Sequence, residues 1–227
     1  QFVLGYTRSF PESSLRLRLE AYHQYTWNIP IDTVNGQTFT TADIYTNYLN
    51  VPLRFATAQR TFGADFILEN TRTERWFWML SASYVDARFR DLSNQWRNSP
   101  FNFGFIGNLM LGRRFALGAD KRKSLSFYTR FVYRGGHPVT PIDLDASRTA
   151  GATVFFNDQL YEARLDDYFR PDLGIHFRNH KDKWAWILSL DIQNVISRDN
   201  EREQFYDFQT GEIGMRTHLG LIPILNY

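Results

Sequence analysis

The sequence predicts an all-β protein, an antiparallel transmembrane β-barrel represented here by about nine strands of a larger wall. Hydrophobic and polar residues alternate with a period of two over long segments. The connections between these segments are short and long in turn, as in outer-membrane barrels, whereas a soluble sandwich has no reason to sort its loops by length. No stretch approaches the roughly 20 consecutive apolar residues of a membrane helix.

The alternation is clearest in residues 15–27, where the odd positions are apolar except for His23 and the even positions are polar except for Tyr22. One face of this segment is suited to hydrocarbon and the other to water. Similar patterns recur along the whole chain. The predicted strands are residues 1–10, 15–27, 55–69, 76–90, 101–117, 124–134, 165–178, 184–196 and 213–227.

The predicted connections fall into two classes. The short ones are residues 11–14, 70–75, 118–123 and 179–183, and the long ones are 28–54, 91–100, 135–164 and 197–212. The strands reach or exceed the roughly 9–11 residues that a tilted strand needs to cross a bilayer. An odd number of strands cannot close as a wholly antiparallel barrel, so we expect residues 1–227 to be the end of a larger one whose earlier strands lie outside this chain.

Aromatic residues make up 17% of the chain, and two tryptophan pairs follow short connections. These are Trp76 with Trp78 and Trp184 with Trp186. Tryptophan gathers at membrane interfaces because its ring is apolar and its N–H seeks a polar partner, so we predict that all four are interface residues. The alternative is that they are core residues of a soluble sandwich.

The formal net charge of +2, from 26 basic and 24 acidic residues, gives no broad electrostatic footprint for nucleic acid. Absence of cysteine excludes disulfides and thiol chemistry. Arginines share the polar faces with carboxylates, which predicts a hydrated lumen crossed by charge pairs. The basic members are Arg16, Arg18, Arg130, Arg134, Arg170 and Arg178, and the acidic ones are Glu20, Asp65, Glu69, Asp172 and Asp191.

The sequence offers no catalytic spacing, because its histidines are dispersed and no nucleophile motif is present. We therefore predict no enzyme activity, no metal site and no cofactor. Ligand contacts are expected on the long connections, since loops carry recognition while a barrel gives a rigid frame. The candidate ligand-binding residues on these loops are Trp96, Arg97, His137, Asp143 and Asp145. The alternative is that they only pack one loop against another.

Five stretches together carry a resemblance to a known family. They are RTFGADFILEN (60–70), YRGGHPVTPID (133–143), RLDDYFRPDLGIHF (164–177), SLDIQNVISRDN (189–200) and GLIPILNY (220–227). In this order the chain resembles the C-terminal barrel portion of TonB-dependent outer-membrane receptors, in the branch with a carboxypeptidase-regulatory-like N-terminal domain. Two departures are Asp65, where the family more often has Glu, and the end at Tyr227 without the family's last few residues.

The resemblance implies a plugged barrel of about 22 strands in the bacterial outer membrane that takes up a scarce nutrient with energy delivered by TonB. It implies outer-membrane lipid, TonB through the N-terminal part, a surface lipoprotein and a nutrient ligand as partners. This chain would supply wall, lumen lining and extracellular loops. Two alternatives are a structural or secretion-associated barrel component that binds proteins through its loops, and an outer-membrane hydrolase with its active site at the loop rim.

Overall fold

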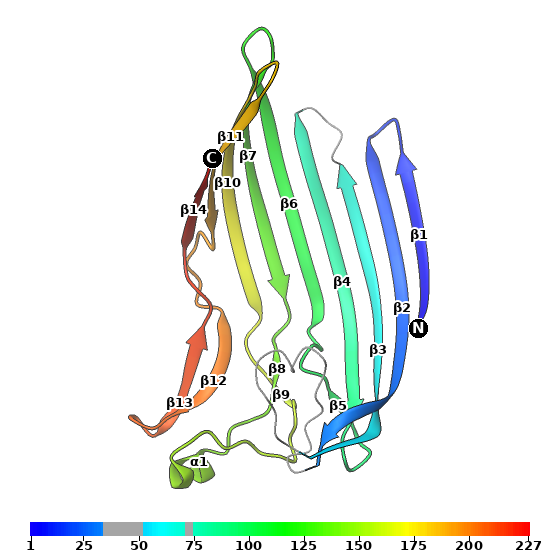
Figure 1. Cartoon of the computed structure of the whole chain (residues 1–227), viewed down its shortest axis with the longest axis vertical. Coiled ribbons are helices and arrows are strands. Elements are labelled where there is room, and N and C mark those ends of the chain that lie inside the picture. The colour runs from blue at the N-terminus through cyan, green and yellow to red at the C-terminus, as the bar shows by residue number, and fades with distance from the viewer. Residues whose placement is uncertain (34–51, 71–74) are drawn as a thin grey trace.

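The computed structural model describes residues 1–33, 52–70 and 75–227, and most of the chain forms one antiparallel sheet (Figure 1). We call the nine strands of its continuous path the wall. In their order across the sheet they are β1 (Phe2–Phe10), β2 (Leu15–Asp32), β3 (Leu53–Asn70), β4 (Trp76–Arg90), β6 (Gly104–Leu117), β7 (Lys123–Arg134), β10 (Tyr168–His180), β11 (Ala185–Gln193) and β14 (Ile222–Asn226).

The connections are sorted by length between the two ends of the wall, as the sequence predicts (Figure 1). The short ones, including residues 11–14, 118–122 and 181–184, lie at the end drawn at the top. The long ones lie at the opposite end. The predicted connection 28–54 begins later than expected, because β2 continues to Asp32 past a bulge at Asn28. Residues 34–51 and 71–74 of the predicted connections lie outside the described residues.

The long connections contain further short elements. These are β5 (Trp96–Asn98), which pairs with β4, the pair β8 (Pro138–Val139) and β9 (Ala163–Arg164), the helix α1 (Leu144–Ala150), and the hairpin β12 (Glu201–Asp207) and β13 (Glu212–Thr217). Among the described residues, no helix has both the length and the apolar character needed to cross a membrane.

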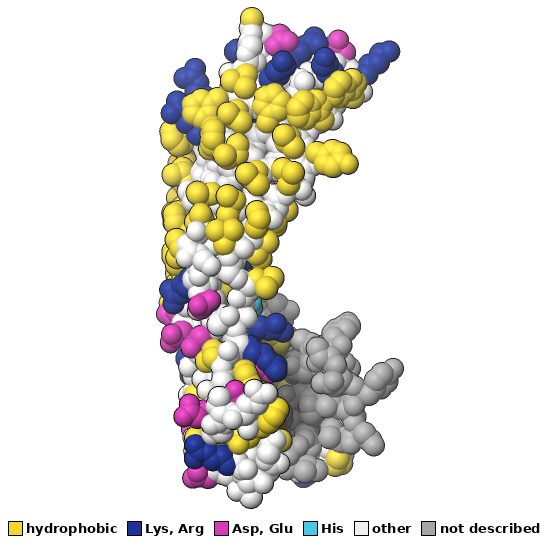
Figure 2. Space-filling view, turned by 90° about the vertical axis from the view of Figure 1, so that its left-hand side faces the viewer, with side chains coloured by type: hydrophobic (Ala, Val, Ile, Leu, Met, Phe, Trp, Pro, Cys, Tyr) yellow, Lys and Arg dark blue, Asp and Glu magenta, His cyan; other side chains and the backbone are white. Residues whose placement is uncertain are grey.

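The strand register places alternate side chains on two chemically different faces. Leu68, Leu80, Leu109 and Phe131 are cross-strand partners and share the apolar face. Ser81, next to Leu80, and Asn108, next to Leu109, are cross-strand partners on the opposite, polar face. Figure 2 shows hydrophobic side chains gathered over the wall, with charged side chains beyond them at the short-connection end.

The apolar face of the wall is uncovered. The exposed fraction is 40% for Leu109, 43% for Ile175 and 47% for Trp76. The buried hydrophobic residues lie instead at the long-connection end or in the connections themselves. They are Ile29, Ala58, Ala87, Phe89, Ile142, Leu160 and Leu165. The conventional core of the described residues is thus a cluster at one end, and the wall itself has no second layer (Figure 1).

Aromatic rings on the polar face lie over glycines of the neighbouring strand. Tyr22 is the cross-strand partner of Gly63, Phe77 of Gly112, and Tyr128 of Gly174. A Cβ atom at residue 112 would stand 2.1 Å from Cζ of Phe77. Glycine is required there because a ring occupies the space that any larger side chain needs.

The wall is open along both edges. Within the described residues β1 bonds only to β2 and β14 only to β11, so no strand pair closes the sheet. The N-terminus and the C-terminus therefore lie at opposite edges (Figure 1). The number of wall strands agrees with the prediction of nine, and the antiparallel all-β class is confirmed.

The predicted strand 213–227 is wrong as a single element. Residues up to Thr217 pair with β12, whereas β14 starts at Ile222 and pairs with β11. Between them, the His218 N–H donates to the Asn200 carbonyl at 2.8 Å. The alternation of apolar residues continues through this change of partner, so the periodicity alone gives no sign of the break.

Gly112→Ala should destabilise the wall by about 1–3 kcal/mol, because the added methyl group collides with the Phe77 ring. Urea unfolding of the protein in lipid vesicles measures the change. Gly5→Ala is the matched control, since its added Cβ would meet Glu20 at an ordinary 3.5 Å. In a Phe77→Ala background the cost of Gly112→Ala should disappear. An equal cost in that background would contradict the ring-over-glycine explanation.

Candidate functional site

Three long connections pack together at one end of the wall, and we call residues 91–103, 135–167 and 194–221 the cap. The Asn98 side chain donates to the Tyr161 carbonyl at 3.1 Å and joins the first to the second. The Asp166 N–H donates to the Glu201 carboxylate at 2.8 Å and joins the second to the third. The Gly135 N–H donates to the Phe105 carbonyl at 2.8 Å and ties the cap to β6.

Close backbone approach makes this packing depend on two adjacent glycines. A Cβ atom at Gly135 would stand 2.1 Å from the Phe103 carbonyl oxygen, and one at Gly136 would stand 1.9 Å from the Leu165 carbonyl oxygen. The neighbours here are backbone atoms, which cannot rotate away. Both glycines belong to the predicted motif YRGGHPVTPID, whose role at this point is therefore steric.

Trp96 and Arg97 lie on β5 and point to opposite faces of the strand. The Trp96 ring has the Arg60 guanidinium 4.3 Å from its centre and that of Arg90 at 4.9 Å. Arg97 donates to Asp91 at 2.8 Å and forms an ion pair with Glu162, which crosses to the second connection. Hydrogen bonding to Asp91 raises the pKa of Arg97. Trp96 therefore contacts the wall, whereas Arg97 joins two connections of the cap.

Asp143 and Asp145 belong to the start of α1. Asp143 is the N-cap, and its carboxylate accepts from the Ala146 N–H at 3.0 Å. Such a cap satisfies one of the free N–H groups of the first turn. Asp145 is fully exposed, and its carboxylate lies 3.8 Å from the Arg148 guanidinium. Asp143 thus has a local structural role, whereas the Asp145 side chain faces solvent.

His137 joins a set of side chains that the sequence did not single out, apart from Arg134. We call Phe103, Arg134, His137, Tyr168 and His218 the Arg134 cluster. The Arg134 guanidinium lies 4.5 Å from the centre of the Phe103 ring and 5.4 Å from that of Tyr168. His137 contacts Phe103 with ring centres 5.6 Å apart, and His218 contacts Tyr168 at 5.4 Å.

Positive charge predominates around the Arg134 cluster. Burial lowers the pKa of His137, and Arg134 and Arg164 lower it further. Burial also lowers the pKa of His218, with Arg134, Arg202 and Arg170 acting in the same direction. The Nε atom of Arg134 is buried and has no hydrogen-bond partner in the part of the chain that the structure describes.

The burial of the Asp172 carboxylate, which is 3% exposed, is a second feature that the sequence pattern does not show. It accepts from Arg130 at 2.6 and 2.9 Å, pairs with Arg170 at 3.0 Å, and accepts from the Asn194 N–H at 2.9 Å. Asn200 in turn accepts from and donates to the Phe169 backbone at 2.9 and 3.0 Å. These residues fasten the third connection to β10.

The signal for this network was present in the sequence. Asp172, Asn194 and Asn200 lie in two of the stretches that carry the family resemblance. The sequence predicts Arg130 and Asp172 on a polar face, and the structure pairs them. Other residues predicted on the polar faces are also paired, Arg16 with Glu69 and Arg18 with Glu20.

A polar trio occupies the middle of the polar face. The Tyr128 hydroxyl donates to Asp191 at 2.6 Å, and Nε2 of His176 lies 2.8 Å from the same oxygen. Ser126 and Ser189 are the ladder partners of His176. Within the described residues no hydrogen bond joins either serine to the imidazole. The trio therefore lacks the nucleophile–base contact that nucleophilic catalysis requires.

The four predicted interface tryptophans lie at the short-connection end, away from the cap. Trp76 and Trp78 begin β4, and Trp184 and Trp186 stand at the start of β11. Their exposed fractions include 54% for Trp184 and 37% for Trp186. Arg113 lies 5.0 Å from the centre of the Trp76 ring.

Comparisons with protein-family models, curated proteins and solved structures found no match to this chain. In the ranges 1–33, 52–70 and 75–227, no group of three or more His, Cys, Asp or Glu side chains could hold a metal ion.

Asp172→Asn should cost about 1–3 kcal/mol of stability, because it removes the buried carboxylate that pairs with Arg130 and Arg170 and accepts from the Asn194 N–H. Urea unfolding in lipid vesicles measures this loss. Asp145→Asn is the control, since Asp145 is exposed and its substitution should be almost neutral. Equal stability of the two variants would contradict the role assigned to Asp172.

Acidification should loosen the cap around His137 and His218. Their folded-state pKa values lie below the unfolded value of about 6.5, so the unfolded chain binds more protons and stability is lost as pH falls below that value. Hydrogen exchange of residues 135–143 and 213–221, corrected for intrinsic rates, should be faster at about pH 5 than at about pH 7. A variant with His137→Asn and His218→Asn should lose this difference. Slower exchange at the lower pH would reverse the assigned sign.

Proposed function

We propose that this chain is part of the wall of a β-barrel in the bacterial outer membrane. The single observation that carries the proposal is the uncovered apolar face, which spans neighbouring strands of the wall. A soluble protein rarely leaves a contiguous apolar surface of this kind exposed. Lipid hydrocarbon is a suitable cover, because it needs no specific side-chain partner.

The dimensions of the apolar face agree with this environment. On β4 the alternating apolar positions run from Trp76 to Tyr84, and Asp86 and Arg88 follow on the same face. At about 3.3 Å per residue these eight steps cover roughly 26 Å along the strand, which at a strand tilt of about 40° is roughly 20 Å of depth and most of the roughly 25 Å height of an outward apolar band. Aromatic residues stand at both ends of the run, as in an interface belt.

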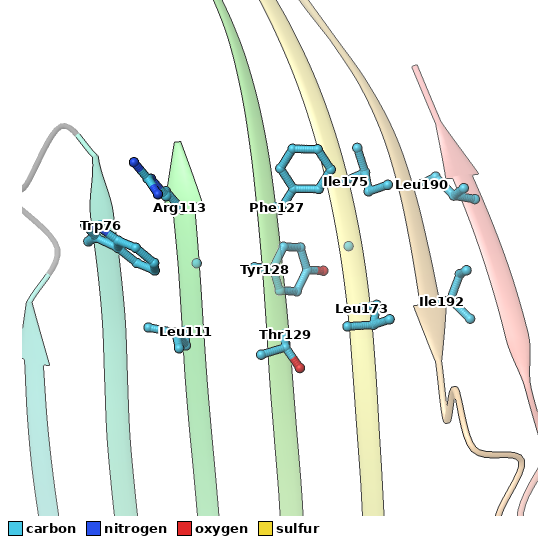
Figure 3. Close-up of a pocket in the computed structure, with 12 residues that line it drawn as sticks. Trp76, Leu111, Arg113, Phe127, Tyr128, Thr129, Leu173, Ile175, Leu190 and Ile192 are labelled. Atoms are coloured by element: carbon cyan, nitrogen blue, oxygen red, sulfur yellow. The ribbon is translucent and has the colours of Figure 1, made fainter. Parts of the chain in front are cut away.

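A shallow groove of about 400 Å³ lies on the apolar face (Figure 3). Its walls are side chains of β4, β6, β7, β10 and β11, including Leu111, Phe127 and Ile175. Arg113 and Trp76 stand at its short-connection end (Figure 3). This is the arrangement expected where acyl chains meet a headgroup layer, with aliphatic side chains along the depth and a cation with an aromatic ring at the boundary.

The polar face supports a hydrated interior. It carries ion pairs such as Arg130 with Asp172 and the hydrogen-bonded side chains of Tyr128 and Asp191. The open backbone edges of β1 and β14 support completion by further strands, since unpaired N–H and C=O groups cost several kcal/mol each in hydrocarbon.

Resemblance in five motifs extends the proposal to a TonB-dependent receptor for energy-coupled nutrient uptake. The wall strands, the polar face and the cap would then be barrel wall, lumen lining and extracellular loops. A plug domain and the TonB-contacting segment would belong to other parts of the receptor. Support comes from the motif residues themselves, because Gly135, Gly136 and Asp172 hold the junction between wall and cap.

A structural or secretion-associated barrel component is the second candidate. The observation that favours it is the exposed apolar tip of the β12–β13 hairpin, where Phe208 is 74% and Ile213 44% exposed. A partner protein, such as a surface lipoprotein, would cover these side chains. Stable co-purification lost on Phe208→Ser, with uptake unaffected, would favour this candidate over the receptor.

Leu109→Arg should impair membrane assembly, whereas Asn108→Arg should not. Leu109 points to the apolar face and Asn108 to the polar face of the same strand. An arginine at mid-depth on the lipid side costs about 2–4 kcal/mol. The heat-modifiable folded fraction of the full-length protein in outer-membrane extracts measures assembly. Equal assembly of both variants would contradict the assignment of faces.

Deletion of the gene should abolish uptake of one scarce nutrient under limiting supply, and the full-length gene should restore it. The same loss should follow deletion of TonB, because the proposed transport is energised through it. Growth on a panel of glycans, peptides, siderophores and cobalamins at limiting concentration identifies the nutrient. Uptake that persists without TonB would overturn the receptor proposal and leave the barrel wall intact.

A further inference from the structure

We propose that Arg134 and Arg202, together with His137 and His218, bind the oxyanion group of a small ligand, either a carboxylate or a phosphate. The proposed site lies where the cap meets the polar face of β7 and β10. It deepens the proposed receptor function, on which it rests, by naming the chemistry of a ligand that this end of the lumen would recognise.

The first argument is charge imbalance. No carboxylate contributes to the pKa values of Arg134, His137 or His218, whereas arginines lower those of both histidines. Arg134 and Arg202 take part in none of the ion pairs formed by the described residues. The lowered pKa values favour the neutral imidazoles, so the positive charge resides on the arginines, and an oxyanion beside Arg134 and Arg202 would supply the counter-charge that they lack.

Nearby carboxylates are already engaged. Asp172 is shared by Arg130 and Arg170, and Glu203 pairs with Arg216 at 3.1 Å. Asp167 accepts from the Tyr133 hydroxyl at 2.6 Å and from the Gly136 N–H at 2.9 Å. Asp167 keeps its negative charge, because both of its donors are neutral, but no ion pair joins a carboxylate to Arg134 or Arg202 among the described residues.

The second argument is the fixed position of Arg134. Its guanidinium is held between the Phe103 ring, from the first cap connection, and the Tyr168 ring, from β10. A guanidinium positioned in this way loses little further conformational freedom when it binds a ligand. Its planar set of N–H donors matches two oxygens of a carboxylate or phosphate.

The third argument is an adjoining groove that gives a ligand access. It has a volume of about 270 Å³ and lies between residues 137–140 and the β12 strand. His137 and Arg202 line it together with Thr140, Gln204 and Glu203, whose carboxylate pairs with Arg216, and the Phe155 and Tyr161 rings form apolar parts of its surface. Arg134 and His218 lie beside this groove and do not line it. Polar side chains and ring faces in one groove suit a small polar ligand that carries an acidic group, such as a sugar acid.

Calorimetric titration of the full-length protein in detergent at low ionic strength tests the proposal with three probes. These are glucuronate, inorganic phosphate and glucose, which differs from glucuronate by lacking the carboxylate. We expect saturable binding of glucuronate, phosphate or both, and none of glucose. Binding of glucuronate alone identifies a carboxylate ligand, and binding of phosphate alone identifies a phosphorylated one. Absence of binding by both anions, or equal binding of glucose, overturns the proposal.

Arg134→Gln and Arg202→Gln should each weaken anion binding by about tenfold or more, because each removes a charge-assisted hydrogen bond. Arg202 is exposed, so its substitution keeps the test valid if Arg134→Gln fails to fold. Arg114→Gln, at the far end of the polar face, should leave binding unchanged. Unchanged affinity in the Arg202 variant overturns the site. If no anion binds but TonB-dependent uptake is observed, the oxyanion site is wrong and the proposed receptor function is retained.

Discussion

The continuous antiparallel ladder of the wall is the constraint on which the rest of the structure depends. Because successive residues of a strand point to opposite sides, the ladder separates Leu80, Leu109 and Phe131 from Ser81 and Asn108 across the whole sheet. No described element packs on the apolar side, so its cover has to come from outside these residues. The proposed environment, with lipid on that side and water on the other, would satisfy both faces at once.

The stabilising core is displaced to one end as a consequence. Phe89, Leu160 and Leu165 are buried where the long connections fold over the end of the wall, and Arg97 with Glu162 joins two of these connections. Along the strands, stability comes instead from the ladder, from rings seated over glycines, and from buried polar groups with complete sets of partners. Asp172 is the clearest example, because two arginines and a backbone N–H satisfy its carboxylate.

The same geometry leaves one group of charges unsatisfied. Asp172 pairs with both Arg130 and Arg170, whereas Arg134, two ladder pairs beyond Val132 and Arg170, takes part in no ion pair among the described residues and contacts the Phe103 and Tyr168 rings. The two parts of the polar face therefore have different roles. The ion pairs of Asp172 fasten the cap to the wall, whereas Arg134 is available to an external oxyanion.

Local periodicity and turn composition are sufficient to predict the first eight wall strands, their two faces and the sorting of the connections by length. They do not reveal the break between Thr217 and Ile222, since the alternation continues while the pairing partner changes. The Arg134 cluster is also absent from the sequence pattern. Phe103, Tyr168 and His218 meet Arg134 and His137 because segments distant in sequence fold over the same end of the wall. Such contacts depend on long-range packing, which leaves no periodic trace in the sequence.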